Sequence, residues 1–142
     1  MARNSQSKVD KSAFKKIKFT SNSVIFNEGD PGDAAYMIRS GRVEIRKGSQ
    51  SSQPQTLAEL GKGEVVGELA LFDDRPRMAA AICLTDVVAI SISRKKFHDL
   101  MSTMDPAMEV IVLTMVKRVR EMADEFMRRK AAADWINWKR QK

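Results

Sequence analysis

The hydrophobic period of this chain changes once, close to Ser93, and that change constrains the fold more than any other feature. Before it, apolar residues such as Ile17 and Phe19 alternate with other residues, which is typical of half-buried strands. After it, apolar residues recur every three or four positions, which is typical of helices. The order predicts a strand-rich unit over residues 15–93 followed by helices.

Turn signals divide the first part into short strands. The sequence EGDPGD at residues 28–33 is a strong double turn, and the polar stretch GSQSSQPQ at residues 48–55 predicts a hairpin loop. Apolar runs at residues 78–84 and 87–92 predict two strands joined by a Thr-Asp turn. Short strands separated by frequent turns favour a sandwich or a small barrel.

Capping residues mark the starts of two helices in the second part. Ser93 suits the N-cap of a helix over residues 94 to about 103. Asp105 and Pro106 then suit the cap and the first position of a second helix. That helix is predicted to run to about residue 133, which gives it a length of about 40 Å.

The second predicted helix carries a broad apolar face made of two adjacent stripes. The first stripe follows spacings of four, three, four and three residues, through Val112, Val116, Val119, Ala123 and Phe126. The second stripe is formed by Met108, Ile111, Met115 and Met122. Either both stripes pack within the chain, or one covers the sheet and the other meets a partner helix. The spacing leaves both arrangements open.

Composition limits the class of protein. The chain has 142 residues, of which 43% are apolar, enough for one domain with a core. No apolar run approaches the ~20 residues of a membrane helix, and the N-terminus has no apolar signal segment. The single cysteine, Cys83, lies in an apolar run and is predicted to be a small core residue. These features predict a cytoplasmic protein.

The net charge of +7 is concentrated at the two ends of the chain. We therefore divide it into a short N-terminal arm at residues 1–14, a domain at residues 15–133 and a basic tail at residues 134–142. The charged ends are predicted to be solvated termini. The alternative is a basic surface for an anionic partner such as nucleic acid.

The segment GELALFDDRPRMAAA at residues 67–81 has the features of an anion site. Gly67 allows a tight turn, and the next four residues can form one helical turn whose free amides face an anion. The small side chain of Ala70 lets an oxygen reach the main chain. Arg77 offers a planar, permanently charged fork suited to phosphate oxygens. Glu68 is unusual beside a phosphate unless it accepts a hydrogen bond from a group such as a sugar hydroxyl.

This segment resembles the phosphate-binding cassette of the cyclic nucleotide-binding domain family, which includes kinase regulatory subunits, gated channels and bacterial catabolite-activator regulators. The family pattern is Phe-Gly-Glu-Leu-Ala-Leu, four variable residues, then Pro-Arg-x-Ala. This chain has Gly-Glu-Leu-Ala-Leu at residues 67–71 and Pro-Arg-Met-Ala at residues 76–79. Residues 24–33 and 36–43 resemble the opening strands of the family, and the resemblance covers roughly residues 15–130.

The resemblance implies an α+β fold, an eight-stranded antiparallel β-roll (jelly-roll-like) with a short phosphate-loop helix and C-terminal B and C helices. It also implies which residues contact the ligand. The ribose is assigned to Gly67 and Glu68, the phosphate to Leu69, Ala70, Arg77 and Ala79, base packing to Met78 and Leu60, and a cap over the base to Phe126, Trp135 or Trp138.

Three positions depart from the family pattern. Val66 replaces the aromatic residue before Gly-Glu, as a core substitution. Asn22, which tolerates left-handed geometry, replaces a glycine before the second strand. Met78 stands where relatives that prefer cGMP usually carry Thr. Because methionine cannot donate a hydrogen bond to guanine, we predict cAMP as the ligand and keep cGMP as the alternative.

These features predict a non-enzymatic cyclic nucleotide sensor that signals by repositioning its C-helix toward an effector protein or a dimer partner. One alternative is a transcription-regulator-like protein that lacks its helix-turn-helix. Only the twelve residues 131–142 lie beyond the region of resemblance, too few for such a DNA-binding domain, so we do not expect DNA binding. An enzyme on a cupin-like roll would need several metal ligands, whereas His98 is the single histidine, so we expect neither metal nor catalysis. A protein-interaction module with a weak or unselective pocket is the other alternative, although Glu68 and Arg77 are both present.

Overall fold

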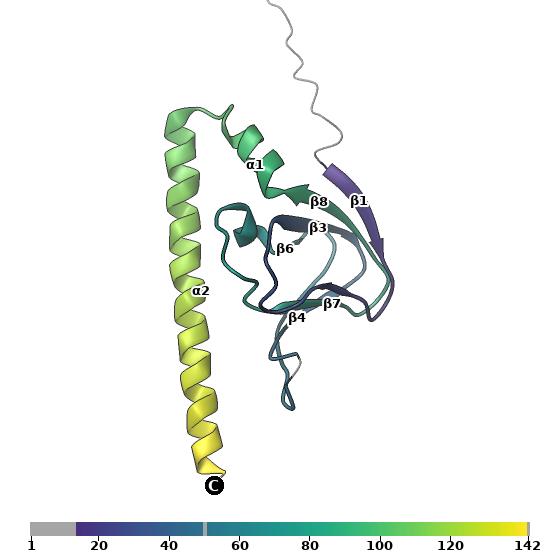
Figure 1. Cartoon of the computed structure of the whole chain (residues 1–142), viewed down its shortest axis with the longest axis vertical. Helices are drawn as coiled ribbons and strands as arrows, with labels where there is room; N and C mark the ends of the chain where they lie inside the picture. The colour runs from purple at the N-terminus through teal and green to yellow at the C-terminus, as the bar shows by residue number, and fades with distance from the viewer. Residues whose placement is uncertain (1–13, 50, 142) are drawn as a thin grey trace, which may run out of the picture. The chain divides into compact units, whose positions relative to one another are not determined.

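Two four-stranded antiparallel sheets form the first part of the chain in the computed structural model, which describes residues 14–49 and 51–141. One sheet has the order β1-β8-β3-β6, with bounds Phe14–Phe19, Val87–Ser93, Ala34–Ser40 and Val65–Val66. The other has the order β2-β7-β4-β5, with bounds Val24–Phe26, Ala80–Cys83, Val43–Lys47 and Gln55–Leu60. The strands fold over one another as a roll (Figure 1). The predicted eight-stranded antiparallel β-roll is confirmed.

The core lies between the two sheets because alternate residues of each strand face inward. Ile38 pairs with Ala89 across β3 and β8, and Val43 pairs with Cys83 across β4 and β7. All four side chains are buried in one hydrophobic cluster. Cys83 is therefore the core residue that the sequence predicted, and burial raises the pKa of its thiol although a hydrogen bond with Ser23 opposes the shift.

Two tight turns need the residues found in them. Asn22 has a left-handed backbone with φ 68°, as expected for the residue that replaces a glycine. Gly41 has φ 91°, and a Cβ there would collide with the carbonyl oxygen of Asp86. The hairpin between β3 and β4 therefore depends on glycine. Val66, the other departure, is 1% exposed in the core, as predicted.

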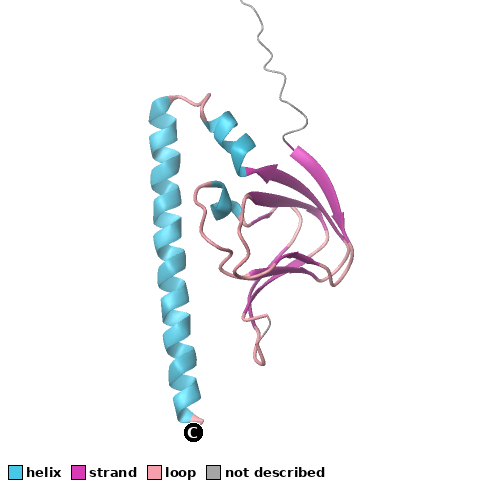
Figure 2. Ribbon diagram, viewed as in Figure 1, coloured by secondary structure: helices cyan, strands magenta, loops and turns pink. Residues whose placement is uncertain are grey.

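Within the described residues, three helices follow or interrupt the strands, and Figure 2 draws them in cyan. The short 3₁₀ helix η2 spans Glu68–Leu71, α1 spans Arg94–Met101 and α2 spans Pro106–Arg140. The Ser93 side chain accepts a hydrogen bond from the Lys96 amide, and the Asp105 side chain accepts one from the Ala107 amide. Both predicted N-caps are confirmed.

The long helix α2 does not end near residue 133 but continues to Arg140. Residues 131–140 contain no Gly or Pro and include three alanines, so nothing in the sequence stops the helix there. Lys139 and Arg140 lie in its last turn, where positive charge stabilises the negative end of the helix dipole. Most of the predicted basic tail at residues 134–142 is therefore helical.

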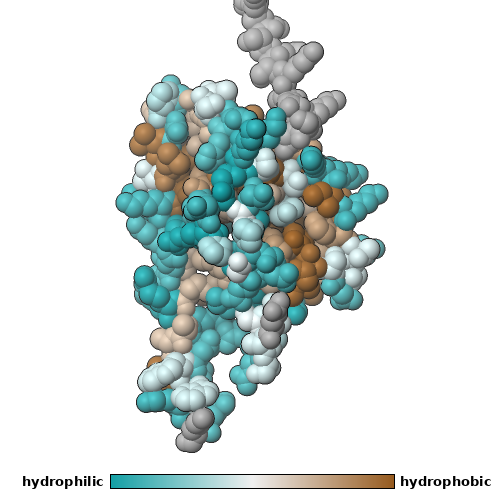
Figure 3. All heavy atoms as spheres, viewed as in Figure 1, coloured by the Kyte–Doolittle hydropathy of each residue, from teal (hydrophilic) through white to brown (hydrophobic). Residues whose placement is uncertain are grey.

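The chain divides after Ser102 into two units, the β-roll with α1 and the helix α2 with its leading turn. No described side chain of α2 is buried, and hydrophobic side chains lie among polar ones along its first turns (Figure 3). Within the described residues, no helix is both long and apolar enough to cross a membrane. The predicted N-terminal arm at residues 1–14 lies outside the described residues except for Phe14, which begins β1.

Candidate functional site

The predicted anion segment begins at Gly67, whose backbone is left-handed with φ 74°. A Cβ at this position would collide with the Nη1 atom of Arg77, so the close approach of these two residues requires glycine. Helix η2 follows directly as a single turn. Both local features that the sequence predicted for this segment, the tight turn and the short helix, are present.

Arg77 is buried, with 8% of its surface exposed. Its Nη2 donates to the Ala34 carbonyl at 2.6 Å, and its Nη1 donates to the Gly67 carbonyl at 3.2 Å. The guanidinium carbon lies 4.0 Å from the centroid of the Phe26 ring, a cation–π contact. The Nε atom packs against Gly32 and is buried with no hydrogen-bond partner, so the donors of this cation are not fully used.

The charge of Arg77 is not paired with a carboxylate in the part of the chain that the structure describes. Among the described residues, no acidic side chain forms an ion pair with it. Burial lowers the pKa of its guanidinium and Arg94 adds to that shift, while Tyr36, Asp33 and Asp30 oppose it. A buried cation without a counterion is costly. An anionic ligand would remove that cost, so the residues fit a phosphate group.

Two of the predicted phosphate donors meet at one oxygen, the carbonyl of Gly67. Arg77 Nη1 donates to it, and so does the Ala70 amide at 3.2 Å. An acceptor that replaces this carbonyl could therefore receive hydrogen bonds from both. The third predicted donor on this side, the amide of Leu69, belongs to the same turn of η2.

Glu68 lies at the surface beside these groups. Its side chain is exposed, and within the part of the chain that the structure describes its carboxylate has no hydrogen bond or ion pair. It does not pair with Arg77. The carboxylate is thus available to accept a hydrogen bond from a ligand.

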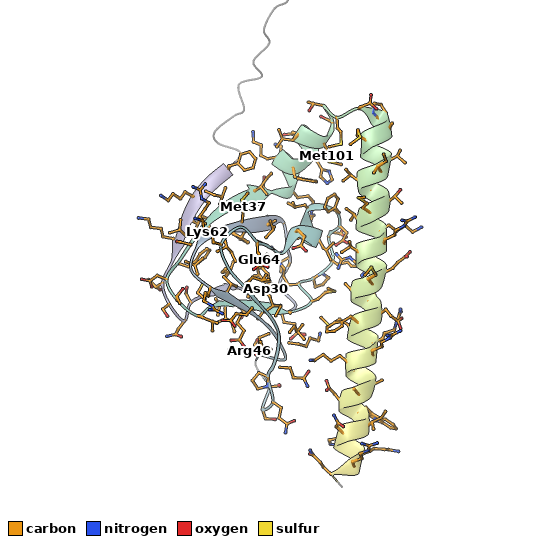
Figure 4. The ribbon with its side chains drawn as sticks, turned by 180° about the vertical axis from the view of Figure 1, so that it is seen from behind. Asp30, Met37, Arg46, Lys62, Glu64 and Met101 are labelled. Atoms are coloured by element: carbon orange, nitrogen blue, oxygen red, sulfur yellow. The ribbon has the colours of Figure 1, made fainter. Side chains whose placement is uncertain are left out.

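The other end of the segment is held by the turn between β2 and β3. The Arg77 amide donates to the Asp30 carbonyl at 2.9 Å, and the Gly29 amide donates to the Arg77 carbonyl at 2.8 Å. One residue later, the Met78 carbonyl accepts a hydrogen bond from Lys47 Nζ at 3.2 Å. Figure 4 labels Asp30 within the roll, above the label of Arg46 near the end of β4. Arg77 is therefore fixed at its backbone as well as at its side chain.

Helix α1 is joined to η2 by contacts that the sequence reasoning missed. Arg94 Nε donates to the Ala70 carbonyl at 2.7 Å, and its Nη2 donates to the Gly32 carbonyl. His98 Nε2 lies 2.9 Å from the Leu71 carbonyl. One sequence signal existed for Arg94, because a cation in the first turn of a helix is unfavourable with the helix dipole unless it has another partner. No comparable signal marks Lys47.

The residues assigned to the base lie in two different units of the chain. Leu60 is half-buried against the core, and Met78 is half-buried at the end of the cassette. The three candidate caps are exposed on α2, with exposed fractions of 53% for Phe126, 54% for Trp135 and 53% for Trp138. Because α2 is a separate unit, their role as a cap stays a prediction. No group of three or more His, Cys, Asp or Glu side chains in the described ranges is arranged to hold a metal.

Comparison with known protein families identifies the family of this chain. The family described as "Cyclic nucleotide-binding domain" matches residues 16–104, from β1 to the start of the second unit. The chain belongs to the cyclic nucleotide-binding domain family. The match includes both ends of the cassette and helix α1, but not the three candidate caps on α2.

Regulatory proteins are among the relatives of this cyclic nucleotide-binding domain. It is 30% identical over 104 residues to a CRP-like cAMP-activated global transcriptional regulator of Mycobacterium tuberculosis, covering 73% of this chain and 46% of that protein. It is 35% identical over 96 residues to a cAMP-dependent protein kinase regulatory subunit of Aspergillus niger, covering 68% of this chain and 23% of that protein. The chain thus spans half or less of these relatives.

A solved structure with the same fold has been determined with two ligands. The EAL enzyme Bd1971 in its cAMP-bound form matches 79% of this chain and 30% of its own chain, with a TM-score of 0.64 and 32% identity. Its cGMP-bound form matches 78% of this chain and 30% of its own chain, with a TM-score of 0.66 and the same identity. That neighbour has thus been solved in a cAMP-bound and in a cGMP-bound form.

Proposed function

We propose that this domain is a cAMP sensor without enzymatic activity of its own. The observation that supports it most is the buried guanidinium of Arg77, which has no carboxylate partner among the described residues. A cyclic phosphate carries the negative charge that this position needs. In this proposal, Arg77 binds the phosphate together with the amides of Leu69, Ala70 and Ala79, and Glu68 accepts a hydrogen bond from the ribose 2′-hydroxyl.

Ligand binding is proposed to exchange one set of hydrogen bonds for another. Arg77 and the Ala70 amide would leave the Gly67 carbonyl and donate to phosphate oxygens instead. Since Arg94 and His98 both contact carbonyls of η2, a movement of this short helix would pull on α1. This becomes a switch only if cAMP binds the alternative positions of the helices with different affinities.

The base preference is proposed to depend on Met78, with Leu60 packing beside the base. A methionine side chain offers apolar contact and no hydrogen-bond donor. Guanine therefore gains no hydrogen bond at this position, unlike in relatives that carry Thr there, and we expect the domain to prefer cAMP. The neighbour with cAMP-bound and cGMP-bound forms indicates that the fold alone does not exclude either ligand.

Titration calorimetry of cAMP, cGMP and 5′-AMP into the same protein sample tests the ligand. We expect cAMP to bind more tightly than cGMP, and 5′-AMP to bind much more weakly because its phosphate is not cyclic. If neither cyclic nucleotide binds, the proposed function is wrong. If cGMP binds more tightly than cAMP, only the role of Met78 is wrong.

The output is proposed to pass through α2 to an effector protein or to a second copy of the chain. The stripe of Met108, Ile111, Met115 and Met122 is exposed on this helix, which supports a partner of apolar character. Light scattering of the protein with and without cAMP tests the dimer. A monomer in both conditions would remove the dimer and leave an effector protein as the proposed partner.

A further inference from the structure

We propose that Lys47 is a positioning residue for the phosphate site, because its ammonium binds the Met78 carbonyl and thereby aims the amide of Ala79 at the ligand. The proposal rests on the proposed function, which assigns the Ala79 amide to the phosphate. Lys47 is the last residue of β4, and its Nζ lies 3.2 Å from the Met78 carbonyl oxygen. Neither the sequence motif nor the cassette itself includes this lysine.

The geometry of one peptide group links Lys47 to the ligand. The carbonyl of Met78 and the N–H of Ala79 belong to the same peptide, and no described peptide bond is cis. In a planar trans peptide these two groups point in opposite directions. A hydrogen bond that holds the carbonyl on the Lys47 side therefore fixes the direction of the N–H. A charged donor on the carbonyl also polarises the peptide and strengthens its N–H as a donor.

This peptide lies between two anchored points. Before it, the backbone of Arg77 is hydrogen-bonded to Gly29 and Asp30. After it, β7 begins at Ala80 and joins the sheet beside β4. Met78 itself precedes this strand, which spans Ala80–Cys83. The hydrogen bond from Lys47 therefore acts on the short segment between Arg77 and Ala80.

Glu28 holds the Lys47 ammonium in place. Its Oε1 lies 2.6 Å from Lys47 Nζ, and its Oε2 accepts a hydrogen bond from the Gly48 amide at 2.8 Å. Burial raises the pKa of the Glu28 carboxyl, but the hydrogen bonds from Lys47 and Gly48 lower it more, so the net pKa is below its ordinary value. The carboxylate stays ionised at neutral pH. Because Gly29 follows Glu28 directly, the same turn supports both the carbonyl of Arg77 and the ammonium of Lys47.

Two variants of Lys47 test this role by their affinity for cAMP in calorimetry. Lys47→Met removes the donor and the charge with little change in length, and we expect cAMP affinity to fall by about fivefold, the loss of roughly one hydrogen bond. Lys47→Arg keeps a charged donor, and we expect most of the affinity to return. Lys18→Met is the matched control, because it removes the same charge from an exposed position on β1 in the other sheet, and we expect no change.

Salt separates positioning from a general attraction between Lys47 and the phosphate. At about 1 M salt the Debye length is about 3 Å, so a long-range charge effect is screened. If the affinities of the wild type and Lys47→Met become equal there, Lys47 acts through its charge and the positioning role is wrong. If the difference persists, positioning is supported.

An amide signal gives a second measurement that does not depend on affinity. In the 15N-resolved NMR spectrum of the protein without ligand, we expect Lys47→Met to shift the Ala79 amide resonance more than Lys18→Met does. An unchanged Ala79 resonance together with wild-type affinity would overturn the proposal. Wild-type protein that fails to bind cAMP would instead overturn the proposed function, while the Ala79 resonance would still report on the contact with Lys47.

Discussion

The two ends of the cassette differ in burial and in the contacts of their charged side chains. At one end, the Glu68 side chain is exposed and has no partner among the described residues. At the other, Arg77 is buried, donates to two backbone carbonyls and lies over an aromatic ring. A residue without contacts has nothing to lose when a ligand arrives, whereas a residue with contacts must exchange them. We therefore expect Glu68 to affect affinity alone and Arg77 to affect affinity and stability together.

The largest effect is expected from Arg77→Ala. Loss of a charge-assisted phosphate contact of about 1.5–3 kcal/mol lowers cAMP affinity by at least tenfold. The same substitution removes the hydrogen bonds that Arg77 donates to the carbonyls of Ala34 and Gly67, so the midpoint of thermal unfolding also falls. Calorimetry and thermal melts of one preparation measure both quantities. Unchanged affinity would exclude Arg77 from the phosphate site.

Glu68→Gln is the matched change at the exposed end. We expect cAMP affinity to fall by about tenfold, because a charged acceptor for the ribose hydroxyl is replaced by a neutral one. The free energy of unfolding should stay within about 0.5 kcal/mol of the wild type, as for other exposed positions. A clear loss of stability would show that the two ends of the cassette are not held differently.

Gly67→Ala tests the contact that joins the two ends. A methyl group on this left-handed residue collides with Arg77, so the side chain of Arg77 must move. We expect the free energy of unfolding to fall by about 1–2 kcal/mol and cAMP affinity to fall severalfold. Denaturant unfolding and calorimetry measure the two effects. Wild-type values for both would mean that Arg77 does not need its contact with Gly67.

Met78→Thr is expected to have the smallest effect, confined to the choice of base. A hydroxyl at this position can hydrogen-bond guanine, and one neutral hydrogen bond contributes about 0.5–1.5 kcal/mol. We expect the ratio of cAMP to cGMP affinity to fall by about twofold to tenfold, while stability stays unchanged. The two titrations on the variant measure the ratio directly, and an unaltered ratio would remove Met78 as the selectivity position.

Local features of the site followed from the sequence because they depend on near neighbours in the chain. The tight turn at Gly67, the short helix after it and the caps at Ser93 and Asp105 were all predicted correctly. The end of α2 was predicted too early, because a basic segment was interpreted as a tail although it contains no residue that breaks a helix. Charge alone does not end a helix.

The sequence by itself determined the strand and helix order, the core position of Cys83 and the residue types of the cassette, since these follow from periodicity, turn chemistry and a motif with fixed spacing. Only the tertiary structure decided which groups contact Arg77, which contact η2 and which contact Met78. Arg94 and Lys47 come from α1 and β4, far along the chain from their carbonyl partners. Such contacts depend on strand register and on the packing of α1 against the roll, and a pattern of neighbouring residues does not encode them.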